Sequence, residues 1–431
     1  MEMHAVKPVS GPIVGRLRPP GSKSLTNRAL VAAALADGAS RLVGALDSED
    51  TRVMIDSLVR LGIAVIIDPA DRTFQIHGCG GRLPNRNVNL SVANSGTTIR
   101  FLTALVALGQ GTFRLDGSER MRQRPIQDLL DGLEQLGVDA KAESAGGCPP
   151  VVVHAAGLRG GRSTVRGDIS SQFLSGLLLA APYAASPIDL ALDGPLVSQP
   201  YVRMTLAVMR EFGVEVESPA DLSHFHIPRG CYRGREYAIE PDASAASYFF
   251  AAAAITGGRV TVEGLGRDSL QGDIAFCDCL ERMGCEVQYG DREITVVGRS
   301  LRGIDADLNA ISDTVQTLAV VALFAEGPST IRNVAHIRHK ETDRIGNLAA
   351  ELRKVGGEVV ELSDGLTITP QPLHGARIET YRDHRMAMSL ALVGLRVSGV
   401  VILDPRTTEK TYPEFFHDLV RLTTTTKQTQ S

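Results

Sequence analysis

The sequence contains no tryptophan, and aromatic residues make up only 5% of its 431 residues. It also lacks any apolar run near the roughly 20 residues that a membrane-spanning helix needs. Its first 20 residues show neither the apolar core of a secretory signal nor the Arg- and Ser-rich composition of an organelle leader. With 43% hydrophobic and 22% charged residues, the composition indicates a soluble globular protein, which we expect in the cytoplasm.

Paired cysteines and a strong net charge are lacking as well. The six cysteines include no C-x-x-C pair, which favours free thiols in a reducing compartment over metal ligands. The 45 Lys and Arg residues against 49 Asp and Glu give a net charge of −4, so no general attraction to nucleic acid or to membranes is expected. Any anion site must therefore be local, in a chain whose length predicts two or three domains.

The sequence does contain one pattern six times: a polar helix cap, an apolar helix rich in Ala and Leu, a turn with glycine and a β-branched strand. Successive copies begin 69 to 75 residues apart. They span 24–43, 95–115, 170–190, 243–262, 312–331 and 383–402. Amphipathic helices that end at glycine lie between the copies. This alternation predicts an α/β or α+β fold of repeated units, and a single large doubly wound sheet is the alternative.

Three repeats per domain place a domain boundary near residues 238–242. The sixth repeat has a second helix, 415–422, but only 423–426 and a polar tail follow it. We expect the N-terminal segment Ala5–Leu17 to supply its missing strands. The first domain is then 21–239, and the second is discontinuous, formed by 1–20 and 240–431.

The helix caps carry groups that bind anions. A helix N-terminus offers unpaired N–H groups and the positive end of the helix dipole. The first cap adds Lys23, Ser24 and Arg28, and the second contains Gly96, where a ligand can approach the backbone. One such cap alone is usually an ordinary serine N-cap. Their recurrence, with 170–172 and 383–385 as further examples, favours several N-termini that serve one anion site.

Four further stretches contain candidate binding groups. The loop 120–125 has three arginines, although any one of them is more often solvated. Segment 197–201 offers hydroxyls beside a proline, and 408–413 places a lysine before a helix. Segment 339–344 contains both charge signs, which is also typical of ion pairs at a helix start.

Taken together, these stretches closely resemble the 5-enolpyruvylshikimate-3-phosphate synthase family of enolpyruvyl transferases. The matching motifs, in the family's order, are P-G-S-K-S-x-x-N-R, N-S-G-T-T-x-R, S-S-Q-F, K-E-T-D-R, D-H-R-M-A-M and K-T-Y-P. The resemblance implies a two-domain inside-out α/β barrel, with three units per domain and the active site between the domains. It implies transfer of the enolpyruvyl group of phosphoenolpyruvate to the 5-hydroxyl of shikimate-3-phosphate in aromatic amino acid biosynthesis. It implies no metal or organic cofactor, and a monomer.

The resemblance also assigns residues by motif position. Shikimate-3-phosphate is expected to contact Lys23, Ser24, Arg28, Ser170, Ser171, Gln172, Ser198, Tyr201, Asp313 and Lys340. Phosphoenolpyruvate is expected to contact Lys23, Gly96, Arg124, Gln172, Arg344, Arg385 and Lys410. Both substrates carry a phosphate and a carboxylate, and this charge explains the need for many cations.

The family's reaction is an addition followed by an elimination, through a tetrahedral ketal. Asp313 and Glu341 are the expected acid–base residues, and Lys23 and Lys340 are expected to stabilise charge. The sequence departs from the best-known enterobacterial and plant form at Ser95 and Phe101, where that form has alanine and proline, and His336 stands where asparagine is common.

Two alternatives are considered. UDP-N-acetylglucosamine enolpyruvyl transferases share the fold and chemistry, but they carry Lys-Asn near the start and usually a loop cysteine, which this chain lacks. An anion-binding protein without turnover is the second alternative, and the set of Asp313, Lys340 and Glu341 argues against it.

Overall fold

The computed structural model describes residues 2–428 of the chain. They divide into two compact units. Residues Gly21–Ile239 form the middle unit, and the segments up to Pro20 and from Glu240 onward form the terminal unit. The chain therefore passes between the units twice, after Pro20 and after Ile239. None of the helices in the described part is both long and apolar enough to cross a membrane.

The described residues of the middle unit form three small sheets on one plan. In each sheet, the strand that follows a buried helix pairs in parallel with one neighbour and antiparallel with the other. The strand orders are β13-β3-β5-β4, β6-β7-β9-β8 and β10-β11-β12. The strands are β3 (Ala39–Val43), β4 (Ala64–Asp68), β5 (Thr73–His77), β6 (Val88–Ser91), β7 (Gln110–Asp116), β8 (Asp139–Ala142), β9 (Val151–Ala156), β10 (Gly161–Arg166), β11 (Ile188–Asp193), β12 (His224–Ile227) and β13 (Glu236–Ala238).

The terminal unit repeats this plan, again with three sheets among the described residues. Their strand orders are β15-β16-β14-β2, β17-β18-β20-β19 and β1-β22-β21. The strands are β1 (Met3–Ala5), β2 (Val14–Leu17), β14 (Arg259–Glu263), β15 (Glu286–Tyr289), β16 (Glu293–Val297), β17 (Asp305–Asp307), β18 (Ser329–Arg332), β19 (Glu358–Glu361), β20 (Leu366–Thr369), β21 (Arg377–Ile378) and β22 (Val401–Leu403). The sequence prediction of six repeated β/α units is confirmed, and the single large sheet is wrong.

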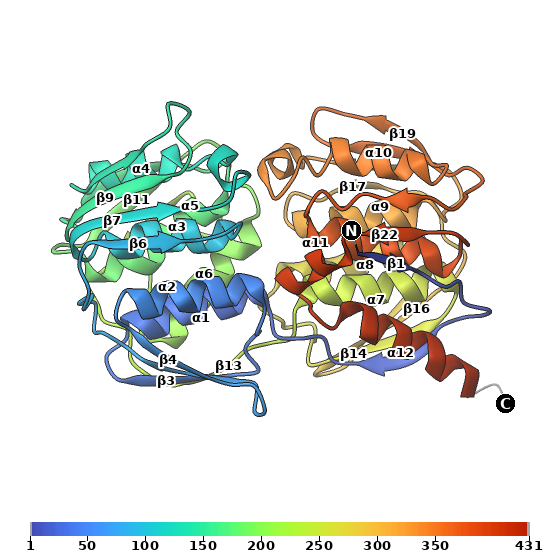
Figure 1. The fold of residues 1–431 in the computed structure, drawn as a ribbon, viewed down its shortest axis with the longest axis horizontal. Coiled ribbons are helices and arrows are strands. Elements are labelled where there is room, and N and C mark those ends of the chain that lie inside the picture. Colours follow the sequence, from blue (N-terminus) through green and yellow to red (C-terminus); the bar gives the residue numbers. More distant parts are fainter. Residues whose placement is uncertain (1, 429–431) are drawn as a thin grey trace. The chain divides into compact units, whose positions relative to one another are not determined.

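Each unit has buried helices at its centre (Figure 1). These inner helices are α1 (Lys23–Leu35), α3 (Gly96–Val106) and α5 (Ser171–Ala180) in the middle unit, and α7 (Ala243–Thr256), α9 (Val315–Ala322) and α11 (His384–Ala391) in the terminal unit. Within each unit they pack on one another, and every residue of α7 is buried. A helix packed on all sides has no solvent face, which explains the runs of Ala and Leu in the sequence. This arrangement, with helices inside and sheets around them, is the inside-out α/β barrel that the resemblance implied.

The outer helices are amphipathic. They are α2 (Glu49–Arg60), α4 (Gln127–Gln135), α6 (Gln199–Glu211), α8 (Phe276–Met283), α10 (Gly346–Lys354) and α12 (Phe415–Gln428). The last is longer than the predicted helix 415–422, so the expected break after residue 422 is wrong. Helix α12 packs on β2 at Gly15, where a Cβ would lie 2.2 Å from the Leu422 side chain. Glycine at this position therefore permits the close approach.

The strands close to the two points where the chain passes between the units pair with strands that are distant in the sequence. Strand β1 joins the sixth repeat, antiparallel to β22 (Figure 1), but it overlaps the expected segment Ala5–Leu17 only at Ala5. The rest of the N-terminal segment goes elsewhere, because β2 pairs in parallel with β14 of the fourth repeat. Likewise β13, which precedes α7 in the chain, pairs in parallel with β3 of the first repeat. Strand β2, which precedes α1 of the middle unit, thus belongs to a sheet of the terminal unit. Strand β13, which precedes α7 of the terminal unit, belongs to a sheet of the middle unit. Each is the parallel neighbour of the strand that follows the inner helix in that sheet's repeat.

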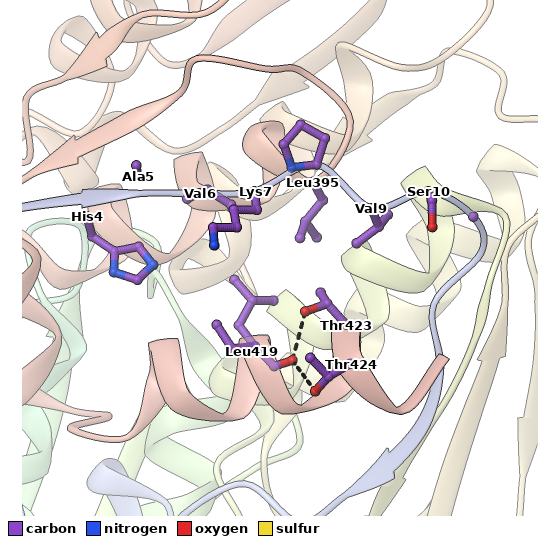
Figure 2. A pocket seen from close by; sticks show the side chains of 13 residues that line it. His4, Ala5, Val6, Lys7, Val9, Ser10, Leu395, Leu419, Thr423 and Thr424 are labelled. Carbon is purple, nitrogen blue, oxygen red and sulfur yellow. Dashed lines mark hydrogen bonds between the residues drawn. The ribbon is translucent and has the colours of Figure 1, made fainter. Parts of the chain in front are cut away.

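A cavity of about 530 Å³ lies in the terminal unit between the segment after β1 and helix α12 (Figure 2). Its wall includes His4, Lys7 and Leu419. The hydroxyls of Thr423 and Thr424 also line it, and both donate to the Val420 carbonyl. The first and last described elements of the chain therefore line one cavity.

Candidate active site

The N-termini of the three inner helices of the middle unit are capped by serine. The side chain of Ser22 accepts a hydrogen bond from the Leu25 N–H, Ser95 accepts from Thr98, and Ser170 accepts from Gln172. Ser22, and not Ser24, is therefore the cap of α1, and Lys23 and Ser24 occupy its first turn. The free N–H groups and the positive end of each helix dipole make these ends suitable for anions.

Gln172 connects the N-termini of α3 and α5. Its amide nitrogen donates to the Thr97 hydroxyl at 3.2 Å, and its amide oxygen accepts from Arg100 Nη1 at 2.7 Å. Arg100 lies one helical turn after Gly96 and also donates to the Pro125 carbonyl. The sequence interpretation included Arg100 only as the last residue of the motif N-S-G-T-T-x-R and did not assign it to either substrate.

Gly96 lies directly against the guanidinium of Arg124. A Cβ at position 96 would be 2.3 Å from Arg124 Nη2 and 2.8 Å from Arg100 Nη1. Arg124 is buried, and its Nη1 donates to the Asn94 carbonyl at 3.3 Å. Glycine at position 96 therefore makes room for two cations at the N-terminus of α3.

Arg28 is a further buried cation, and it lies in the second turn of α1. Its guanidinium donates to Thr205 Oγ1 at 2.7 Å and to the carbonyls of Ser24 and Tyr201 at 2.9 and 3.0 Å. It also lies over the Phe101 ring. Burial lowers the pKa of Arg28 to about 10, so it stays charged at neutral pH. Arg28 ties α1 to α6 and supplies positive charge from within the unit.

The other hydroxyl candidates of the middle unit lie at the starts of α5 and α6. Ser171 is the first residue of α5, and Ser198 directly precedes α6 in the left-handed conformation, with φ +53°. Tyr201 is in the first turn of α6, and its ring faces the Arg28 guanidinium at 6.0 Å.

Arg344 is the centre of a charged network in the terminal unit. Its side chain is 2% exposed and contacts three carboxylates. Nη1 donates to Asp313 at 3.1 Å, Nη2 to Glu341 at 2.8 Å, and Nε to Asp383 at 2.7 Å. Burial alone lowers the pKa of Arg344, but the three carboxylates outweigh burial and raise it. Arg344 is therefore a permanent cation that fixes the position of all three acids.

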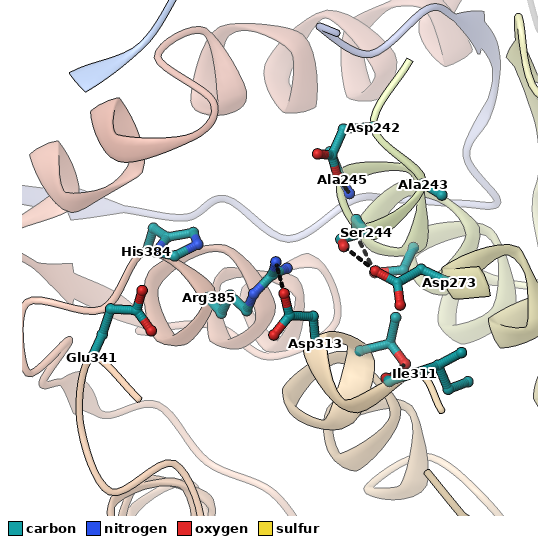
Figure 3. A network of polar contacts seen from close by, with 12 residues as sticks. Asp242, Ala243, Ser244, Ala245, Asp273, Ile311, Asp313, Glu341, His384 and Arg385 are labelled. Carbon is teal, nitrogen blue, oxygen red and sulfur yellow. Dashed lines mark hydrogen bonds and ion pairs between the residues drawn. The ribbon is translucent and has the colours of Figure 1, made fainter. Parts of the chain in front are cut away.

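Two of these acids are shared with a second cation. Asp313 accepts from Arg385 Nη2 at 2.7 Å, which Figure 3 shows, and Glu341 accepts from Lys410 Nζ at 3.0 Å. Arg385 also donates to the hydroxyl of Tyr248, whose pKa is raised to about 12 by burial. The network thus places three cations beside three carboxylates, and each proposed acid–base residue lies between two cations.

Local structure explains how the chain positions these groups. Asp383 caps α11 by accepting from the Arg385 N–H at 2.9 Å, and it has no exposed surface. Asp313 lies in a short 3₁₀ turn, Ser312–Thr314, so Ser312 is not the side-chain cap that the sequence suggested. Lys340 directly follows another 3₁₀ turn, Ala335–His339. The sequence interpretation treated Asp383 only as a cap, because a cap aspartate gives no sign of its further partners.

His336 lies in the same region and is neutral over the physiological range. Burial, and then the positive charge of Lys340, lower its pKa to about 3 from 6.5. Since the folded state resists protonation, the unfolded state binds an extra proton as the pH falls below 6.5. His336 therefore contributes stability above pH 6.5, and this contribution is lost progressively towards about pH 3.

We expect the His336→Asn variant to lose part of the acid sensitivity of the terminal unit. Below pH 6.5 the wild-type free energy of unfolding should fall more steeply than that of the variant. The difference in slope is at most about 1.4 kcal/mol per pH unit for one proton. Urea unfolding across this pH range measures it, with the exposed His374→Asn as a control. Parallel curves for wild type and His336→Asn would contradict the assignment.

Comparison with known proteins identifies the family. The model of the family EPSP synthase (3-phosphoshikimate 1-carboxyvinyltransferase) matches residues 8–419. The chain belongs to this family. It is 47% identical to the 3-phosphoshikimate 1-carboxyvinyltransferase of Trichormus variabilis and 48% identical to that of Nostoc punctiforme, in each case over 96% of this chain and 98% of the relative. The solved EPSP synthase structure from Acinetobacter baumannii has a TM-score of 0.81 and 26% identity, over 98% of both chains. These matches favour this family over the UDP-N-acetylglucosamine enolpyruvyl transferases and over a protein without turnover.

Proposed function

We propose that the chain transfers the enolpyruvyl group of phosphoenolpyruvate to the 5-hydroxyl of shikimate-3-phosphate and releases inorganic phosphate. The observation that carries this proposal is the Arg344 network, in which Asp313 and Glu341 are each shared with a second cation. Addition and elimination move protons in opposite directions, so the reaction needs positioned acid–base groups near anion-binding cations. Family membership supports the identity of both substrates.

The substrate contacts follow the motif positions. The shikimate-3-phosphate set consists of Lys23, Ser24, Arg28, Ser170, Ser171, Gln172, Ser198, Tyr201, Asp313 and Lys340. The phosphoenolpyruvate set consists of Lys23, Gly96, Arg124, Gln172, Arg344, Arg385 and Lys410. Arg28 has little freedom to move, because its guanidinium already donates to four oxygens of the protein. We therefore expect Arg28 to contact the substrate without a change in the position of its side chain.

In the addition step, the methylene carbon of phosphoenolpyruvate gains a proton from Glu341. The 5-hydroxyl oxygen attacks the adjacent carbon and gives its proton to Asp313. In the elimination step, Glu341 takes a proton back from the new methyl group while the carbon–oxygen bond to phosphate breaks. Lys23 and Lys340 stabilise the charge that moves to the phosphate. Glu341 has then regained the proton that it gave, and the proton that Asp313 took from the hydroxyl passes to the departing phosphate or to water.

The shared cations suggest how substrate binding prepares the acids. In the structure, Lys410 and Arg385 donate to Glu341 and Asp313. A bound phosphate or carboxylate competes for these donors, and charge-assisted hydrogen bonds to it are strong. Each acid then keeps Arg344 as partner and has one oxygen available for proton transfer. Substrate binding thus exchanges internal ion pairs for contacts with the ligand.

A phosphate-release assay tests the proposed function. We expect release when phosphoenolpyruvate is combined with shikimate-3-phosphate, and none with UDP-N-acetylglucosamine. Mass spectrometry should show a product in which the acceptor carries the enolpyruvyl group. Release with the nucleotide sugar would support the alternative transferase, and binding of both ligands without release would indicate an anion-binding protein.

A further inference from the structure

Glu351 is a buried carboxylate outside the charged network described above. It lies in α10, it has no exposed surface, and it accepts three hydrogen bonds. The Tyr381 hydroxyl donates to Oε1 at 2.6 Å, the Glu379 N–H donates to Oε2 at 3.0 Å, and Lys354 Nζ donates to Oε1 at 2.8 Å. Two of these donors belong to the segment that leads into α11.

That segment has an unusual backbone. Tyr381 and Arg382 are consecutive residues with φ of +51° and +57°. Residues other than glycine rarely adopt this left-handed conformation, and surrounding contacts must hold them there. The next residue, Asp383, begins α11 and receives the Arg344 guanidinium, and Arg385 follows in the first turn. The backbone conformation at Tyr381 and Arg382 therefore determines the positions of the two side chains that follow, the Asp383 carboxylate and the Arg385 guanidinium.

Helix α10 contacts this segment at two places. Arg344, just before the helix, pairs with Asp383, and Glu351, inside the helix, pairs with Tyr381 and Glu379. The two contacts thus come from positions seven residues apart, one just before α10 and one inside it. Burial, and then the hydrogen bond to Glu351, raise the pKa of Tyr381, so its hydroxyl stays protonated and remains a donor.

We propose that Glu351 is a positioning residue for the transferase: through Tyr381 and the Glu379 N–H it holds the left-handed segment that orients Asp383 towards Arg344 and Arg385 towards Asp313. Glu351 acts through these residues and does not touch substrate. A buried carboxylate is costly, and apolar packing often stabilises a fold equally well. Its three hydrogen bonds, two of them to the segment before α11, give this carboxylate a specific geometric task. The proposal rests on the proposed function, in which Arg344 and Arg385 bind phosphoenolpyruvate.

Two variants test the positioning role. Tyr381→Phe removes one hydroxyl, and Glu351→Gln keeps the shape but turns an amide nitrogen towards a donor. Each should raise KM for phosphoenolpyruvate about tenfold or more, because small displacements of binding groups have large kinetic effects. KM for shikimate-3-phosphate should stay near the wild-type value, since most of its contacts are in the middle unit. A variant that only destabilised the fold would reduce the fraction of folded enzyme and therefore the apparent kcat. It would not raise KM for phosphoenolpyruvate while leaving KM for shikimate-3-phosphate unchanged.

The matched control is Lys354→Met. Lys354 is the half-exposed partner of the same carboxylate, and its loss leaves the bonds to Tyr381 and Glu379 in place. We expect both KM values of this variant to match wild type. The double variant Glu351→Gln/Tyr381→Phe should be no worse than the more affected single variant, because both changes break the same contact.

A Lys410→Met variant separates failure of this proposal from failure of the proposed site. If Lys410→Met raises KM for phosphoenolpyruvate but Tyr381→Phe and Glu351→Gln do not, Glu351 has no positioning role and the site assignment stands. If Lys410→Met also leaves that KM unchanged, the phosphoenolpyruvate site is assigned wrongly and the positioning proposal fails with it. Additive effects in the double variant would likewise overturn the proposal.

Discussion

Replacing Glu341 by glutamine should abolish exchange of the methylene protons of phosphoenolpyruvate and lower turnover by about 10²–10⁴-fold, the usual contribution of a general acid–base group. Glutamine has nearly the same shape, but it cannot donate and take back a proton at the carbon. Glu341 is the acid that Arg344 and Lys410 hold from two sides, at 2.8 and 3.0 Å. Glutamine can accept from only one of these cations, because its amide nitrogen would face the other. The loss of proton exchange, and not the loss of turnover alone, therefore reports the proton transfer.

Turnover in deuterated water, followed by mass spectrometry of product and recovered substrate, measures the exchange. Asp343→Asn is the control in the same segment, because asparagine keeps the contacts with the N–H groups of Ile345 and Gly346 and loses only the ion pair with the partly exposed Arg338. Asp313→Asn should instead lose attack by the 5-hydroxyl. If Glu341→Gln retains both exchange and product formation, Glu341 does not transfer the proton at the methylene carbon.

The repeat architecture could be predicted from the sequence because its signals are local. An inner helix such as α7 shows its burial in an unbroken run of apolar residues, and the outer helices end at glycines. The exchange of β2 and β13 between units could not be predicted in this way. Strands of three or four residues carry little pattern, and their partners β14 and β3 are about two hundred residues away in the chain.

The residues of the candidate site could likewise be predicted only in part. Motifs located Arg344, Arg385 and Lys410, since cations at helix starts and loops are visible in sequence. The partners of buried charges were not predictable. Asp383 appears as an ordinary cap and Glu351 as one more polar residue of an amphipathic helix, yet both are fully buried acceptors for distant donors. Only tertiary packing decides which charged residues of such a helix face inward.

The second large effect is expected at Gly96. Alanine there would place a methyl carbon 2.3 Å from Arg124 Nη2 and 2.7 Å from its Cζ, and the buried guanidinium would have to move. A charge-assisted hydrogen bond is worth about 1.5–3 kcal/mol, so its loss should raise KM for phosphoenolpyruvate about ten- to a hundredfold. Gly96 is the first residue of α3, where alanine is a better helix former, so the melting temperature should not fall.

The comparison with Arg124→Met decides whether Gly96 acts through this cation. The methionine removes the charge and should raise the same KM at least as much. The double variant Gly96→Ala/Arg124→Met should then lie close to Arg124→Met alone, because the nearer guanidinium is gone and only Arg100 Nη1, 2.8 Å from the added Cβ, is left to shift. Gly146→Ala is the control, since a Cβ there meets nothing within 4 Å. Steady-state kinetics with each substrate varied in turn measures all four proteins. A double variant markedly worse than Arg124→Met would show that position 96 acts through another group, either the substrate or Arg100, and that Arg124 is only a neighbour.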